Sequence, residues 1–233
     1  MTLLITNDDG VDAPGLAALI AAAHPHGRVV VVAPREDQSS ISHRVTTGRS
    51  LSITQLGPDR YCVDGTPGDC VRMGLHVLVP DAQWVLSGIN EGGNLGADIV
   101  HSGTVAAARE AVLHGRHGMA FSHYRRSGRA IDWEQATRWV SALIPQLLQE
   151  AQDPHQLWNV NLPHRLAADG TTALPGEPRA VRCLADPSPL PLAYRDAPAY
   201  RYSGNYHTRE RLPGRDIATC FGGDIAISSI GLW

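Results

Sequence analysis

Short apolar runs alternate with longer amphipathic stretches along the first two-thirds of the chain. The apolar runs predict buried β-strands at Leu3–Ile5, Val29–Val32, Gln83–Leu86, Gly118–Ser122 and Leu157–Asn161. The run Val29–Val32 contains only valine, a β-branched residue typical of strands buried on both faces of a parallel sheet.

Stretches of helical length separate these strands. Helices are predicted at Pro14–Ala23, Pro67–Val79, Thr104–His114 and Ile131–Gln149. Thr66 and Asp69 stand where the capping box of the second helix would lie. Strands that alternate with helices predict βαβ units, so we expect a three-layer α/β/α fold with a mostly parallel sheet.

The last third of the chain has a different character. After about Pro163, proline, glycine and arginine become frequent and the periodicity weakens. We therefore expect a core over residues 1–163 and an extension over residues 164–233. The extension is predicted to consist of turns and short strands that pack on the core, with a last strand at Asp224–Ile230. Leu51–Thr54 and Tyr61–Val63 are predicted to form a pair of extended segments within the core.

Composition and charge exclude several kinds of protein. Hydrophobic residues make up 43% of the 233 residues, which predicts a folded chain with a substantial core. The net charge of -3 argues against binding to nucleic-acid polymers, which need a basic surface. All 20 basic residues are arginine. A lysine Schiff base, a Walker-type phosphate lysine and a lysine general base are therefore excluded.

The cysteines do not indicate a metal or redox site, and the N-terminus does not indicate a signal peptide. Cys62, Cys70, Cys183 and Cys220 form no C-x-x-C pair, so a zinc ribbon and a thioredoxin-like site lack support. The N-terminus lacks the pattern of a signal peptide, and no apolar run reaches membrane-spanning length. We expect a cytoplasmic protein that does not associate with membranes.

Polar side chains follow the predicted parallel strands at the ends where such sheets bind ligands. Asn7-Asp8-Asp9-Gly10 follows the first strand, a loop with Ser39 follows the second, and Ser87–Gly96 follows the third. By itself, Asp8-Asp9-Gly10 is also typical of a turn. Adjacent carboxylates repel each other, and a cation cancels this repulsion. Together with the polar loops at the same edge of the sheet, the two carboxylates therefore favour a metal site over a simple turn. Oxygen ligands of this kind suit Mg²⁺, Mn²⁺ or Ca²⁺ rather than zinc.

The third loop and the helix after it indicate an anion site. Four glycines are interleaved with Asn90 and Asn94, and glycine lets a backbone approach an anion closely. Ser102-Gly103-Thr104 then opens a helix, whose N-terminus suits a phosphate group. An alternative is that Thr104 only caps the helix while Ser102 is idle, although capping and phosphate binding are compatible. His43 is a further candidate as an acid at this site.

Five sequence blocks, in the family's order, resemble the survival protein SurE family. These blocks are Leu4–Gly10, Val32–Pro34 with Ser39, Gly65–Val71, Ser87–Ala107 and Trp158–Pro163. The chain departs from the family pattern at Gly93, where proline is usual, and over its C-terminal third, which matches poorly.

The resemblance implies a Rossmann-like core and a divalent-metal phosphomonoesterase that acts on nucleoside 5′- and 3′-monophosphates. Some members also act on short-chain polyphosphate. The residues that match the family's ligands for one Mg²⁺ or Mn²⁺ per subunit are Asp8, Asp9, Ser39 and Asn90. The residues that fall where the family handles phosphate are Asn94, Ser102, Gly103 and Thr104. The family's C-terminal part helps to build dimers and tetramers, which implies a homodimer or homotetramer.

The resulting hypothesis is phosphoryl transfer to water with Asp8 and Asp9 as catalytic residues. One of them orients the attacking water or attacks the phosphorus directly, and the sequence leaves both possibilities open. A haloacid-dehalogenase-type phosphatase is disfavoured because Gly10 stands where its second aspartate is required and lysine is absent. A receiver domain also needs a lysine. A non-catalytic, metal-dependent nucleotide-binding or sensor protein would use the same groups and remains the alternative.

Overall fold

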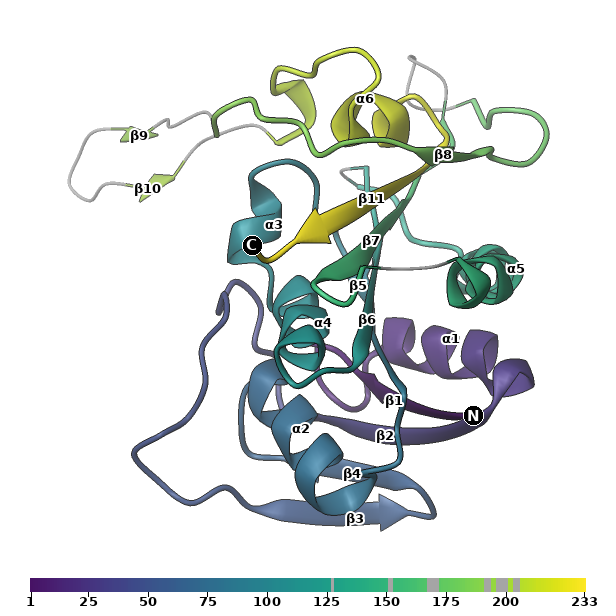
Figure 1. The fold of residues 1–233 in the computed structure, drawn as a ribbon. Helices are drawn as coiled ribbons and strands as arrows, with labels where there is room; N and C mark the ends of the chain where they lie inside the picture. The colour runs from purple at the N-terminus through teal and green to yellow at the C-terminus, as the bar shows by residue number, and fades with distance from the viewer. Residues whose placement is uncertain (127, 151–152, 167–171, 191–193, 196–200, 203–205) are drawn as a thin grey trace.

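The computed structural model describes residues 1–126, 128–150, 153–166, 172–190, 194–195, 201–202 and 206–233. Within these residues, nine strands form one sheet in the order β3-β4-β2-β1-β5-β6-β7-β11-β8 (Figure 1). Their bounds are β1 Thr2–Thr6, β2 Arg28–Pro34, β3 Ile53–Gly57, β4 Arg60–Val63, β5 Trp84–Glu91, β6 His117–His123, β7 Gln156–Leu162, β8 Ala180–Arg182 and β11 Ile225–Gly231. The run from β4 to β7 is parallel throughout, whereas β3 and β11 pair antiparallel with β4 and β7.

Helices cover both faces of the sheet (Figure 1). The bounds of the helical segments are α1 Pro14–Ala23, α2 Pro67–Met73, α3 Asp98–His101, α4 Gly103–Leu113, α5 Trp133–Gln149, α6 Asp216–Phe221, the 3₁₀ turns His24–His26 and Tyr206–Thr208, and the π-helical turn Gly74–Leu78. A further two-stranded ribbon joins β9 Tyr194–Arg195 to β10 Arg201–Tyr202. Among the described residues, none of the helices combines the length and apolar character that a membrane crossing requires.

Alternating side chains of β1 enter hydrophobic clusters on opposite faces of the sheet. Leu3 and Ile5 of β1 pack with α1 and α5, whereas Leu4 between them packs with α2 and α4. This division follows from the two-residue period of a strand, whose successive side chains point to opposite faces. The three-layer α/β/α architecture expected from the sequence is confirmed.

The predicted helices agree closely with the structure, whereas the strand predicted at Gln83–Leu86 is longer and runs as β5 to Glu91. The predicted helix Pro67–Val79 is α2 continued by the π-helical turn, and Thr66 and Asp69 form both hydrogen bonds of the capping box. The helix predicted at Ile131–Gln149 begins at Trp133, because the side chain of Asp132 accepts a hydrogen bond from the backbone N–H of Gln135 and caps it.

Two pairings lie outside what local patterns indicate. The expected pair of extended segments exists as β3 and β4, but β4 also pairs in parallel with β2 and so extends the central sheet. The strand expected at Asp224–Ile230 is β11, which inserts between β7 and β8 of the same sheet. The carboxyl ends of β4, β2, β1, β5 and β6 therefore lie along one edge, where a ligand would bind.

Candidate active site

Two neighbouring carboxylates lie at the carboxyl end of β1. Asp8 is only 4% exposed, and Asp9 is partly buried. The hydroxyl of Thr104 donates to Oδ1 of Asp8 at 2.6 Å, and the backbone N–H of Glu91 donates to Oδ2 of Asp9 at 3.3 Å. The start of α4 and the end of β5 therefore hold the two carboxylates in place.

Burial and mutual repulsion disfavour the charged forms of this pair. Burial raises the pKa of Asp8 above its ordinary value. Burial, followed by the charge of Asp8, raises the pKa of Asp9 to about 7. The carboxylate of Asp37 raises both values further. Across the described residues, neither Asp8 nor Asp9 forms an ion pair with a basic side chain. A divalent cation would supply the missing positive charge, so the donor set fits such an ion.

Neutral oxygens around the pair add to this fit. The side chain of Asn90 donates to the carbonyl of Gly92 at 2.7 Å, and its Oδ1 accepts no hydrogen bond from the described residues. The side chain of Asn7 donates to the carbonyl of Gly10, while its buried Oδ1 has no partner there. The described residues contain no group of three or more His, Cys, Asp or Glu side chains arranged for a metal. A cation here would thus rely on two carboxylates and neutral oxygens.

The loop after β2 passes directly over Asp8. The backbone N–H of Gln38 donates to the carbonyl of Asp8 at 2.7 Å. Ser39 follows at an exposed position, and its hydroxyl donates to Oδ1 of Asp37 at 2.6 Å. The loop therefore brings Ser39 to the same sheet edge as Asp8, with its hydroxyl engaged by Asp37.

The N-terminus of α4 touches the carboxylate of Asp8. A Cβ added to Gly103 would lie 2.9 Å from Oδ2 of Asp8, closer than carbon and oxygen can approach without a shift. Glycine at this position therefore allows the helix start to contact the carboxylate. The positive end of an eleven-residue helix and a buried carboxylate pair are thus adjacent.

Ser102 and Thr104 have different roles at the start of α4. Ser102 is the N-cap of α4, because its Oγ accepts a hydrogen bond from the backbone N–H of Val105 at 3.0 Å. Thr104 does not cap the helix and instead donates to Asp8. The alternative in which Thr104 only caps the helix and Ser102 is idle therefore does not hold.

Asn94 lies in a buried cluster of amides. Its backbone N–H donates to Oδ1 of Asn161, and its carbonyl accepts from the side chains of Asn159 and Asn161. Its side chain donates to the hydroxyl of Ser122 at 2.8 Å. Sequence reasoning assigned no role to Asn159 and Asn161, although two polar residues at a two-residue spacing inside an apolar strand were a usable signal.

The C-terminal part of the chain also supports the glycine loop. The carboxylate of Asp216, at the start of α6, accepts the backbone N–H of Gly96 at 2.8 Å and that of Asp186 at 2.8 Å. Asp216 is fully buried. Residues 216 and 96 are far apart in sequence, so no local pattern indicated this contact.

His43 is engaged with another group. Its Nε2 lies 2.7 Å from Oε2 of Glu110, a buried residue in the later turns of α4. The structure therefore gives His43 a partner on α4, and no described hydrogen bond joins it to Asp8 or Asp9.

Comparisons with known proteins agree on one family. A sequence model described as Survival protein SurE matches residues 3–176. A protein of Nostoc sp. is 45% identical over 99% of this chain and 99% of its own length. The 5′-nucleotidase SurE of Syntrophotalea carbinolica is 45% identical over 70% of this chain and 66% of its own length. The crystal structure of the SurE protein from Aquifex aeolicus matches with a TM-score of 0.84 and 31% identity, over 100% of this chain and 94% of that chain.

Proposed function

This chain belongs to the survival protein SurE family, and on that basis we propose that it is a nucleotidase. It hydrolyses nucleoside 5′- and 3′-monophosphates to nucleoside and phosphate, and it depends on a divalent cation. The name of the Syntrophotalea relative supports nucleotidase chemistry, and the chemistry of the carboxylate pair supports the dependence on a cation.

One observation carries this proposal: the contact between the Asp8 carboxylate and the first turn of α4. The carboxylates of Asp8 and Asp9 favour a cation, whereas the N-terminus of a helix favours an anion. A cation site beside an anion site is the arrangement that a phosphate ester bound to a divalent metal requires.

The roles of the residues follow from this arrangement. Asp8, Asp9, Ser39 and Asn90 would hold one Mg²⁺ or Mn²⁺, which would polarise a phosphate oxygen and neutralise its charge. The helix start at Ser102, Gly103 and Thr104 binds the remaining phosphate oxygens through backbone N–H groups, and Asn94 is the further residue assigned to phosphate binding. Asp8 or Asp9 orients the attacking water or attacks the phosphorus.

The proposal extends to several finer properties. Short-chain polyphosphate is a further substrate, since it presents the same terminal phosphate group. The segment 164–233, which the sequence predicts as an extension of the 1–163 core, contributes to a homodimer or homotetramer. Apolar side chains exposed on the described surface, such as Leu184 and Trp233, support an interface in this region.

The proposed function is tested by phosphate release from a panel of 5′- and 3′-nucleoside monophosphates with Mn²⁺, with Mg²⁺ and with EDTA. We expect release that depends on the metal. In Asp8→Asn, which keeps the shape of the side chain but removes its charge, we expect kcat to fall by roughly a hundredfold or more.

Two results would contradict the proposal. Near-normal turnover by Asp8→Asn would show that the carboxylate is not part of the machinery. Nucleotide binding by a folded wild-type protein, with no phosphate release under any metal, would favour the sensor alternative instead.

A further inference from the structure

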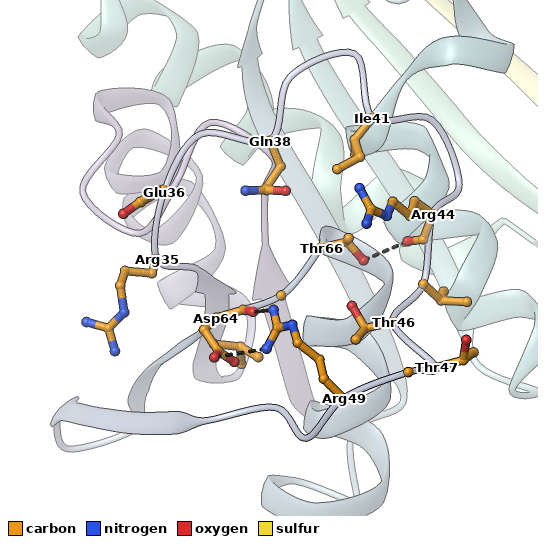
Figure 2. Close-up of a pocket in the computed structure, with 14 residues that line it drawn as sticks. Arg35, Glu36, Gln38, Ile41, Arg44, Thr46, Thr47, Arg49, Asp64 and Thr66 are labelled. Carbon is orange, nitrogen blue, oxygen red and sulfur yellow. Dashed lines mark hydrogen bonds and ion pairs between the residues drawn. The ribbon is translucent and has the colours of Figure 1, made fainter.

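A cavity adjoins the candidate active site. It has a volume of about 740 Å³ and lies between the loop that follows β2 and the turn that follows β4 (Figure 2). Gln38 belongs to its wall, and the backbone of the same residue donates to the carbonyl of Asp8. One short stretch of chain thus borders both the carboxylate pair and the cavity.

The sheet places the two sites side by side. The cavity lies over the carboxyl ends of β2 and β4, and Asp8 lies at the carboxyl end of β1, the next strand in the sheet. Neighbouring strands are about 4.8 Å apart, so two strand spacings separate β1 from β4 by only about 10 Å. A nucleotide whose phosphate sits at α4 can therefore extend its other end into the cavity.

The cavity is held open by contacts of the loop at three points. Ser42 bonds to the backbone of α3, with its hydroxyl donating to the carbonyl of Val100 at 2.9 Å. The hydroxyl of Thr66 donates to the carbonyl of Arg44 at 2.6 Å. The buried carboxylate of Asp69 accepts both the backbone N–H and the hydroxyl of Thr46. The wall is therefore fixed by hydrogen bonds within the protein.

Its lining favours an anion over an aromatic base. Among the described residues, the lining includes three arginines and two carboxylates and contains no aromatic side chain. The carboxylate of Asp64 is paired with Arg49 at 3.0 Å, and Arg35 donates to the hydroxyl of Thr54. The guanidinium of Arg44 and the amide of Gln38 form no hydrogen bond within the described structure. Figure 2 shows both side chains extending into the cavity from the same loop.

We propose that this cavity binds a second anionic group on the leaving group of the substrate, and that Arg44 is the residue that recognises it. The inference rests on the proposed phosphatase function and names its substrate class: nucleosides that carry two phosphates at separate positions. Hydrolysis breaks one ester P–O bond and forms a P–O bond to the water oxygen. The leaving oxygen takes a proton, and the product keeps its second phosphate in the cavity.

The experiment compares adenosine 3′,5′-bisphosphate with adenosine 5′-monophosphate. In the wild-type protein with Mn²⁺, we expect kcat/KM for the bisphosphate to exceed that for the monophosphate by about tenfold, as a charge-assisted hydrogen bond would give. In Arg44→Ala, the ratio of the two values falls towards one, and in Arg44→Lys part of it remains. Arg138→Ala, which removes an exposed arginine of α5, is the matched control and keeps the wild-type ratio.

Nucleotide binding measured in EDTA distinguishes this inference from the proposed function. Calorimetric titration should show tighter binding of the bisphosphate than of the monophosphate, and Arg44→Ala should abolish the difference. The inference is overturned if the protein hydrolyses the monophosphate but the ratio of the two kcat/KM values is near one in the wild type, or is unaffected by Arg44→Ala. Either result leaves the nucleotidase proposal intact. Absence of all hydrolysis overturns the nucleotidase proposal, and the titration then decides the cavity's role alone.

Discussion

The hydroxyl of Thr104 shows how one side chain can matter without contacting the substrate. Thr104 is fully buried, and its hydroxyl joins α4 to the carboxylate pair through a hydrogen bond to Asp8. A hydrogen bond to a charged group contributes about 1.5–3 kcal/mol. Thr104 therefore acts on the reaction mainly by orienting Asp8, in addition to the phosphate contact of its backbone N–H.

Replacing Thr104 with valine should test this positioning role. Valine keeps the branched shape but cannot donate, so we expect kcat to fall by roughly ten- to a hundredfold with a much smaller change in KM for the nucleotide. The concentration of Mn²⁺ needed for half-maximal rate should rise as well. Thr104→Ser keeps the hydroxyl and should retain most activity. Equal losses in Thr104→Val and Thr104→Ser would refute the role assigned to the hydroxyl.

The helix α4 joins the candidate site to the loop that borders the cavity of Figure 2. Its first turn contacts Asp8, and about two turns later the carboxylate of Glu110 is surrounded by basic side chains. That carboxylate contacts His43 at 2.7 Å, His114 at 2.9 Å and the guanidinium of Arg72, while His76 contacts His114. Because His43 belongs to the loop and Arg72 to α2, Glu110 ties three elements together.

These contacts make Glu110 a source of stability that depends on pH. Burial alone would raise its pKa, but hydrogen bonds from His43, Arg72 and His114 outweigh burial and lower the pKa from 4.5 to about 2. Because the pKa of Glu110 is lower in the folded than in the unfolded state, its ionised carboxylate stabilises the fold at pH values above about 4.5. This stabilisation is lost as the pH falls towards 2.

Glu110→Gln should therefore lower the free energy of unfolding by about 3 kcal/mol at pH 7. The difference from wild type should shrink between pH 4.5 and pH 2, where the wild-type carboxylate becomes protonated. Urea unfolding of both proteins across this pH range measures the difference in the free energy of unfolding. Glu134→Gln removes an exposed carboxylate of α5 and should have little effect at any pH. A constant difference from pH 7 to pH 3 would contradict the assigned cause.

The candidate site is formed by residues from distant parts of the chain. The carboxylates follow β1, the glycine loop follows β5, and Asp216 of α6 holds that loop through the backbone N–H of Gly96. A cation bound at Asp8 and Asp9 would interact with the folded state only, because the unfolded chain does not bring these groups together. Metal binding should therefore be visible in the stability of the entire fold.

We expect Mn²⁺ or Mg²⁺ at about a hundred times its dissociation constant to stabilise the protein by about 2.7 kcal/mol. For a chain of this length, this corresponds to a rise in Tm of roughly 5–10 °C relative to EDTA. Asp8→Asn should lose most of the shift. Asp12 lies in the same loop, between β1 and α1, and its side chain is 86% exposed, so Asp12→Asn should keep the shift. An equal shift in wild type and Asp8→Asn would place the cation elsewhere.

Patterns confined to a few neighbouring residues were enough to predict much of this protein. The buried strand β1, the capping box at Thr66 and the start of α5 at Asp132 depend on contacts within one or two turns of chain, so their signals are complete in the sequence. The position of Asp8 and Asp9 at the sheet edge also followed from their place directly after an apolar strand. Their roles as ligands and catalysts remain a proposal.

Contacts between distant segments were decided only when the chain folded. Thr104 donates to Asp8, 96 residues away, so the sequence alone did not show that Ser102 rather than Thr104 caps α4. The insertion of β11 between β7 and β8 and the support of Gly96 by Asp216 likewise depend on packing. Local preferences specify each element, but the partner of a buried polar group is set by whichever group the completed core brings within hydrogen-bonding distance.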